Sequence, residues 1–268
     1  MTEGLFYCVV LARVQDFNMA GLADCLGRAL SIPRIDSAAR LARNKGILHR
    51  TGDLKEAETL KERLGREGVE TFILPSAQLA PIPPFRQVRK AVPKPEGFFW
   101  YDSGGNGQLV PWGRFSLLCA GEMEETHLSK EKGRPEMDIG KIIAGVALAA
   151  ATGIPAGLKP KSKKGEEKEV QKSSFACHLD IIGKRGHESF RITGSLFDYG
   201  YLAGRKEFTA LLNFRKLALD VVGFLPGETT LRNRGVTALE KGSMRDFKYN
   251  SPGEFEQEKL WLLQLAHR

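Results

Sequence analysis

The alternation of apolar and polar positions is clearest in the first 75 residues, where it predicts six elements in a fixed order. The first is an apolar strand with apolar side chains on both faces, which is typical of a central strand covered on both sides, or of a strand with helices on one face and a partner on the other. Two helices, a short extended segment, a third helix and a closing strand follow, and the helices are predicted from apolar residues that recur at helical spacing. In chain order these elements are predicted at residues 6–14, 20–30, 37–44, 46–49, 54–67 and 69–74.

Capping residues predict where these helices begin and end. Asp36 or Ser37 can cap the second helix, and Gly46 can end it by adopting the left-handed conformation. Asp53 is placed to cap the third helix, with Glu56 three residues later at the capping-box position.

Beyond residue 95 the pattern changes to short alternating strands, followed by helices. An aromatic segment and an apolar segment flank a glycine-rich turn and predict a β-hairpin. Residues 233–252 are rich in turn formers. The predicted hairpin strands, two further strands and two helices lie at residues 97–102, 108–121, 174–182, 188–193, 206–222 and from 254 onward.

The chain is therefore predicted to be an α+β protein of two small α/β modules. The first module is a β-α-α-β-α-β unit at 1–75, and the second is a strand-rich domain closed by helices at 96–268. Five prolines at 76–95 indicate an extended linker between them. Within the second module, residues 159–173 read as a charged loop. The uncharged apolar segment 142–154 before it is shorter than the roughly 20 residues of a spanning helix.

The first module resembles the C-terminal domain of the bacterial ribosomal stalk protein. The resemblance is carried by the sequence LKEAETLKERL at 54–64, which leads through EGVE into a strand. In that family the domain has no catalytic centre and uses its first two helices to engage translational GTPases. The resemblance implies a partner-binding face on the matching helices, whose basic residues would contact an acidic protein. These residues are Arg28, Arg34, Arg40, Arg43 and Lys45.

Residues 96–225 weakly resemble bacterial pleckstrin-homology-like domains. The resemblance rests on the sequence QLVPWGRF and on aromatic hairpin strands followed by a closing helix. Such domains bind proteins, peptides or lipid headgroups, so the resemblance implies binding rather than catalysis.

A formal charge of +8 and a pI near 9.3 extend the set of partners to nucleic acid and anionic lipid. A basic cluster directly after the apolar segment is the candidate for an anionic membrane surface. It consists of Lys159, Lys161, Lys163 and Lys164. Candidates for nucleic-acid contacts are scattered through the second module without a known motif. They are Arg185, His187, Arg191, Arg205, Lys206, Phe208, Arg215, Lys216, Arg232 and Arg234.

Candidate chemistry is sparse. The four cysteines form no close pair, which argues against a disulfide framework or a zinc ribbon and favours reduced thiols in a cytosol. The nearest zinc candidates are Cys119, His127, Cys177 and His178, but neighbours on a strand point to opposite faces, so we predict no metal site. Neither a nucleophile elbow nor a cofactor motif is present, and the first residues lack the basic region of a signal peptide.

These observations predict a cytoplasmic, non-enzymatic protein without a cofactor, which binds another protein as an accessory or regulatory factor. The alternatives are a basic nucleic-acid- or ribosome-associated factor and a peripheral membrane adaptor that binds anionic lipid. The two-module interpretation further predicts that, without residues 76–95, the two modules unfold independently.

Overall fold

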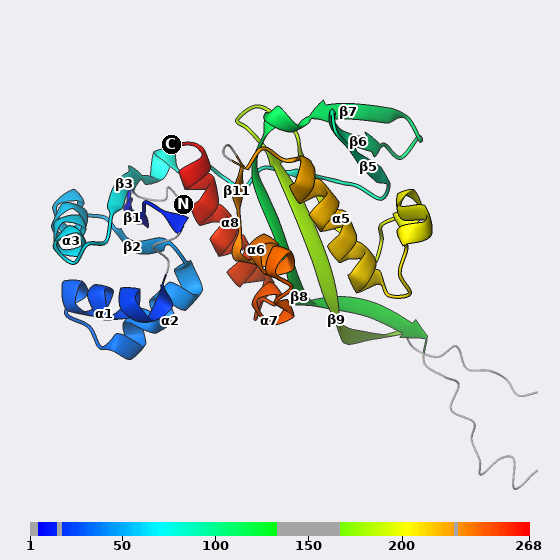
Figure 1. The fold of residues 1–268 in the computed structure, drawn as a ribbon. Helices are drawn as coiled ribbons and strands as arrows, with labels where there is room; N and C mark the ends of the chain where they lie inside the picture. Colours follow the sequence, from blue (N-terminus) through cyan, green and yellow to red (C-terminus); the bar gives the residue numbers. More distant parts are fainter. Residues whose placement is uncertain (1–4, 15–17, 133–166, 228–229) are drawn as a thin grey trace, which may run out of the picture. The chain divides into compact units, whose positions relative to one another are not determined.

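A computed structural model describes residues 5–14, 18–132, 167–227 and 230–268 (Figure 1). The fold class is α+β, as the sequence predicts. Contacts divide the chain into two compact units. One unit combines Met1–Glu125 with Phe175–Arg268, and the other is Thr126–Ser174. In the second unit the described residues are the end of one strand and the beginning of the next.

The N-terminal elements follow the predicted β-α-α-β-α-β order. The strands form an antiparallel sheet of order β2-β1-β3, in which the central strand buries four consecutive residues from Cys8 to Leu11. This burial explains the apolar side chains on both faces of that strand. The elements are β1 (Tyr7–Leu11), α1 (Met19–Leu30), α2 (Arg34–Asn44), β2 (Ile47–Thr51), α3 (Leu54–Arg66) and β3 (Thr71–Pro75).

The second helix begins and ends differently from the prediction. It starts at Arg34, so Ser37 lies inside the helix, and its hydroxyl donates to the carbonyl of Pro33 at 3.3 Å. The residue with a positive φ at its end is Lys45 (φ 54°, ψ −128°), rather than Gly46. Gly46 is required for another reason: a Cβ atom there would lie 2.0 Å from the Trp261 ring.

The third helix is capped as predicted, because the Asp53 carboxylate accepts a hydrogen bond from the Lys55 amide at 2.8 Å. Glu56 does not complete a capping box. Its carboxylate accepts a hydrogen bond from the Thr51 hydroxyl and contacts His49 at 3.1 Å, so it joins α3 to the neighbouring strand.

The remaining described residues form two further sheets and four α-helices. One sheet has the order β11-β8-β9-β10-β4, with β4 parallel to β10, and the other is the antiparallel sheet β5-β6-β7. The strands are β4 (Phe85–Gln87), β5 (Ala91–Lys94), β6 (Gly97–Tyr101), β7 (Gly107–Pro111), β8 (Phe115–Lys132), β9 (Glu167–Gly183), β10 (Ser189–Thr193) and β11 (Leu231–Arg232). The helices are α5 (Ala210–Phe224), α6 (Arg234–Lys241), α7 (Met244–Phe247) and α8 (Pro252–Ala266).

The segment predicted to be a linker contains two of these strands. Val88 and Ala91 are buried in the core, although prolines dominate the composition around them. Pro93 is tolerated because β5 is an edge strand, where a missing amide breaks no ladder hydrogen bond. Residues 85–94 are therefore part of the folded unit, and the interpretation of the whole segment as a linker is wrong for them.

Three other boundaries differ from the sequence analysis. The second hairpin strand ends at Pro111, and after a 3₁₀ turn (Trp112–Arg114) the chain enters β8 of another sheet. The turn-rich region contains the helices α6 and α7. Of the predicted charged loop, residues 167–173 belong to β9, whereas 159–166 and the apolar segment 142–154 lie outside the described residues.

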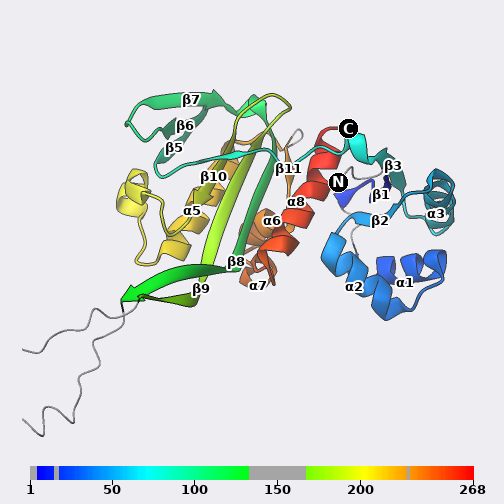
Figure 2. The same ribbon diagram turned by 180° about the vertical axis from the view of Figure 1, so that it is seen from behind.

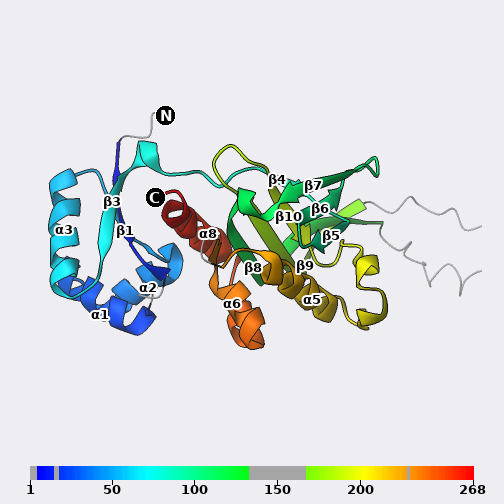
Figure 3. The same ribbon diagram turned by 45° about the horizontal axis from the view of Figure 1, so that its top comes forward.

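Helix α8 joins the two predicted modules. Its residues Phe255, Trp261 and Leu262 are buried in the same core as the N-terminal sheet. The indole of Trp261 donates to the Leu11 carbonyl at 3.1 Å, and Figures 2 and 3 show α8 next to both the N-terminal elements and the strands β8 and β9. Residues from both ends of the chain thus share one core.

Candidate functional site

The structure pairs two of the predicted partner-binding residues with acidic side chains of their own module. Arg28 on α1 contacts Glu67 beyond α3, at 2.5 Å and 3.1 Å. Arg34 at the start of α2 contacts Asp24 on α1 at 2.8 Å. Both arginines are exposed, but their charges are compensated within the chain.

Lys45 is buried and does not belong to an exposed face. Its ammonium contacts the Glu254 carboxylate of α8 at 2.5 Å, and the residue is only 5% exposed. Burial raises the pKa of Glu254, but hydrogen bonds from Lys45 and from the Asn250 amide, together with the positive charges of Lys45 and Arg234, hold the pKa below its ordinary value. This ion pair links α2 to α8 and is structural.

Arg40 and Arg43 are exposed and make no ion pair with any described residue. Helix α2 turns Ser37 and Leu41 toward the core, so the two arginines lie on its outer face. Ile35 lies on the same face and is 78% exposed. We call the outer positions of α2, Ile35, Asp36, Ala39, Arg40, Ala42 and Arg43, the α2 surface.

Five of the candidates for nucleic-acid binding form ion pairs inside the protein. They are Arg191 with Asp180 and Glu256, Arg205 with Asp220, Lys216 with Glu207, Arg232 with Glu240, and Arg234 with Glu254 and Glu258. Arg185 and His187 line a pocket that is described below. The lysines proposed for an anionic membrane surface, 159–164, lie outside the described residues.

Of the zinc candidates, the structure describes the side chains of Cys119, Cys177 and His178, whereas that of His127 lies outside the described residues. Cys119 is fully buried, and His178 contacts Glu125 at 2.7 Å and the Thr193 hydroxyl at 3.3 Å. Burial raises the pKa of the Cys177 thiol to about 12, so the thiol is protonated and unreactive at neutral pH. Within the described ranges, no group of three or more His, Cys, Asp or Glu residues is arranged to hold a metal ion. No helix in those ranges is long and apolar enough to cross a membrane.

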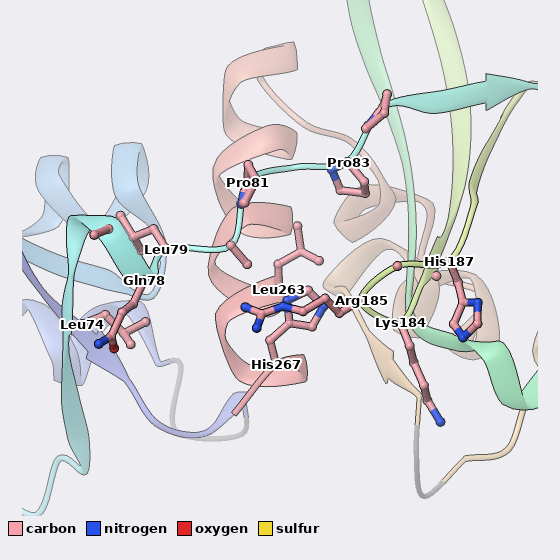
Figure 4. A pocket seen from close by; sticks show the side chains of 15 residues that line it. Leu74, Gln78, Leu79, Pro81, Pro83, Lys184, Arg185, His187, Leu263 and His267 are labelled. Atoms are coloured by element: carbon pink, nitrogen blue, oxygen red, sulfur yellow. The ribbon is translucent and has the colours of Figure 1, made fainter.

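A cavity of about 740 Å³ lies where three segments meet (Figure 4). These segments are residues 74–84, the turn at 183–187 between β9 and β10, and the last turn of α8. The side chain of Gln264 holds residues 74–84 in place. It accepts from the Ala80 amide at 2.8 Å and donates to the Ala80 carbonyl at 3.0 Å.

The walls of this cavity are apolar on one side and basic on the other. Leucines and prolines come from 74–84 and from α8, whereas Lys184, Arg185 and His187 come from the turn and His267 from the end of α8. Figure 4 shows Arg185 beside Leu263 and His267, with Lys184 and His187 leaving the turn in another direction. Burial and the positive charge of Arg185 lower the pKa of His267 below its ordinary value.

A charged network is buried where α8 meets the five-stranded sheet. Lys259 and Asp180 are both 0% exposed, and their charged groups are 2.6 Å apart. Arg191 also contacts Asp180 through two hydrogen bonds of 2.7 Å, and Glu256 contacts both cations. With two cations and two carboxylates, the network is neutral and its charges are paired, as burial requires.

Sequence reasoning identified neither the cavity nor this network. The one available signal for the cavity was the sequence KRGH directly after a strand, which places three basic residues in one turn. The network joins residues of β9 and β10 to residues of α8 that lie more than 60 positions away, and no local sequence pattern indicates such a contact.

A search of protein-family models, curated proteins and solved structures found no match to this chain.

Proposed function

We propose that this protein is a non-enzymatic interaction protein, which binds an acidic partner protein through the α2 surface. The observation that carries the proposal is that Arg40 and Arg43 are exposed and without an ion-pair partner among the described residues, next to the exposed Ile35. Arginine is enriched at protein interfaces, and the buried core of an interface is more apolar than the rest of the surface.

The spacing of the outer residues supports this proposal. Ile35, Ala39 and Arg43 follow one another at intervals of four, so they lie one above the other along the helix. The small side chain of Ala39 leaves room for a partner's side chain between the larger two. The opposite face of α2 is fixed by Leu41 in the core, so this strip is held in place before a partner arrives.

The charge of the α2 surface favours a partner that presents carboxylates. Arg40 and Arg43 outnumber Asp36, which lies nearer the start of the helix. Opposite charges on two proteins steer their encounter and fix the register of the complex. The resemblance of this module to a domain that engages its partners through the first two helices agrees with this placement.

Charge reversal tests the proposal. The partner is first captured from cell extract with the full chain, and its affinity is then measured with both proteins purified. Arg40→Glu together with Arg43→Glu is expected to weaken binding by at least about tenfold and to reduce its salt dependence. Both residues are exposed, so the fold should be unaffected.

The matched control reverses two exposed lysines of α3, Lys55→Glu with Lys61→Glu. This control changes the net charge equally and should leave the affinity nearly unchanged. If both double variants weaken binding to the same extent, general charge attraction rather than the α2 surface holds the partner, and the proposal fails.

The cytoplasm is the location we propose, because Cys8, Cys25, Cys119 and Cys177 are all free thiols. The nucleic-acid alternative gains no support from its candidate residues, since half of them are compensated by carboxylates of the same chain.

A further inference from the structure

We infer that the cavity lined by residues 74–84, the β9–β10 turn and the end of α8 binds a small organic anion, a phosphate or carboxylate group on an apolar body. This site is distinct from the α2 surface and does not depend on the proposed function. Its volume of about 740 Å³ is within the range of pockets that enclose small molecules.

The preference for an anion follows from uncompensated positive charge. Lys184 and Arg185 carry this charge, His187 and His267 add imidazole nitrogens, and none of the described residues that line the cavity is acidic. The acidic residue nearest in sequence, Glu188, is engaged by Arg86 at 2.6 Å. Many cations elsewhere in the described residues are paired with carboxylates, whereas Lys184 and Arg185 at the cavity are free to pair with an external anion.

Arg185 and His267 are the two groups best placed to hold that anion. Neither side chain has a hydrogen-bond or ion-pair partner among the described residues, and both ring nitrogens of His267 are shielded from solvent. A buried nitrogen without a partner is unfavourable, and an oxyanion that accepts from the one N–H of a neutral imidazole would remove that cost for one of the two nitrogens. The planar guanidinium of Arg185 can donate two parallel hydrogen bonds to the same anion.

The apolar walls indicate that the anion carries a hydrophobic body. Leu74, Leu79 and Leu263 face the cavity together with Pro81, Pro83 and Pro84. Prolines have a fixed φ, and Gln264 holds the adjacent Ala80 at both its amide and its carbonyl. This wall is therefore formed before the ligand binds, which lowers the entropy cost of binding.

Calorimetric titration of the full chain with three soluble probes tests the inference. Phenyl phosphate has both the charge and the apolar body, inorganic phosphate has the charge alone, and benzyl alcohol has the apolar body alone. Phenyl phosphate should bind most tightly, by about tenfold over either of the others. Arg185→Ala should weaken its binding by about tenfold, since a hydrogen bond to a charged group is lost.

Arg40→Ala is the matched control, because it removes an exposed and unpaired arginine of the α2 surface. It should not change the affinity for phenyl phosphate. Equal losses in Arg185→Ala and Arg40→Ala, or no saturable binding of phenyl phosphate at millimolar concentration, would overturn the inference.

The same anionic group occurs in free metabolites and in lipid headgroups, and a second arm distinguishes these sources. Phosphatidylcholine vesicles containing phosphatidic acid are sedimented with the wild type and with Arg185→Ala. Cosedimentation that Arg185→Ala abolishes assigns the anion to a lipid headgroup. Binding of phenyl phosphate without such cosedimentation assigns it to a soluble molecule.

Discussion

At the scale of single residues, the packing of α8 against the N-terminal module depends on the absence of one side chain. Gly46 lies against the ring of Trp261, and the preceding Lys45 carries the positive φ and the buried ion pair. Lys45 thus turns the chain, and Gly46 leaves space for the indole ring of Trp261. The glycine is therefore required by its contact with the indole rather than by its backbone conformation.

Gly46→Ala is expected to destabilise the protein by about 1–3 kcal/mol or more, because the new methyl group would overlap the Trp261 ring. Gly65→Ala is the control, since a Cβ atom at Gly65 on α3 meets no atom within 4 Å. That change should be neutral or stabilising by up to about 1 kcal/mol, because alanine favours helix. Urea denaturation of both variants checks this prediction, and equal stabilities would refute it.

At the scale of elements, sequence patterns were reliable where one element alone determines the pattern. The apolar stripe of α3, with Leu60 and Leu64, correctly located that helix, and Asp53 correctly marked its beginning. Patterns failed where a distant element supplies the reason. Pro93 indicates a linker when the sequence is considered alone, because the sequence does not show that Pro93 pairs with a neighbouring strand. Lys45 indicates an exposed basic surface for a similar reason, because its partner Glu254 lies 209 residues away in the sequence.

The same limit applies to the candidate site. Arg40 and Arg43 could be identified from the predicted helix and its resemblance to a partner-binding helix, since no described residue buries them. The cavity could not, because its walls come from three segments that only the tertiary fold brings together.

The contact of α8 with the five-stranded sheet allows a prediction about buried charge. Asp180 accepts from both Lys259 and Arg191, so Asp180→Ala leaves a surplus positive charge and should cost about 3–5 kcal/mol. Lys259→Met should cost clearly less, because Asp180 keeps Arg191 and the methionine fills the space beside Phe255. The two free energies of unfolding, measured by denaturant titration, should follow this order, and the reverse order would contradict it.

At the scale of the whole molecule, one compact unit contains both the N-terminal sheet and most of the remaining elements. The expectation that the chain without residues 76–95 would yield two independently unfolding modules needs revision, since this deletion would remove β4 and β5. The shared core instead predicts a single cooperative transition.

The three tryptophans provide the test, because Trp261 lies in the first core and Trp100 and Trp112 lie in the second. In a Trp100→Phe, Trp112→Phe variant, fluorescence reports the first core alone, and in Trp261→Phe it reports the second. Within each variant, the fluorescence midpoint in urea should coincide with the midpoint from far-ultraviolet circular dichroism. Separate midpoints would show that the two cores unfold independently.

The hydrogen bond from Trp261 to Leu11 spans 250 residues of sequence, and this separation has a consequence for biosynthesis. At roughly 5–20 residues per second, a ribosome needs roughly 10–50 s to proceed from β1 to α8. During that interval the N-terminal sheet exists without the helix that covers it, and its apolar face is open to chaperones or to other nascent chains. The N-terminal sheet is therefore most prone to aggregation during synthesis, before α8 has been made.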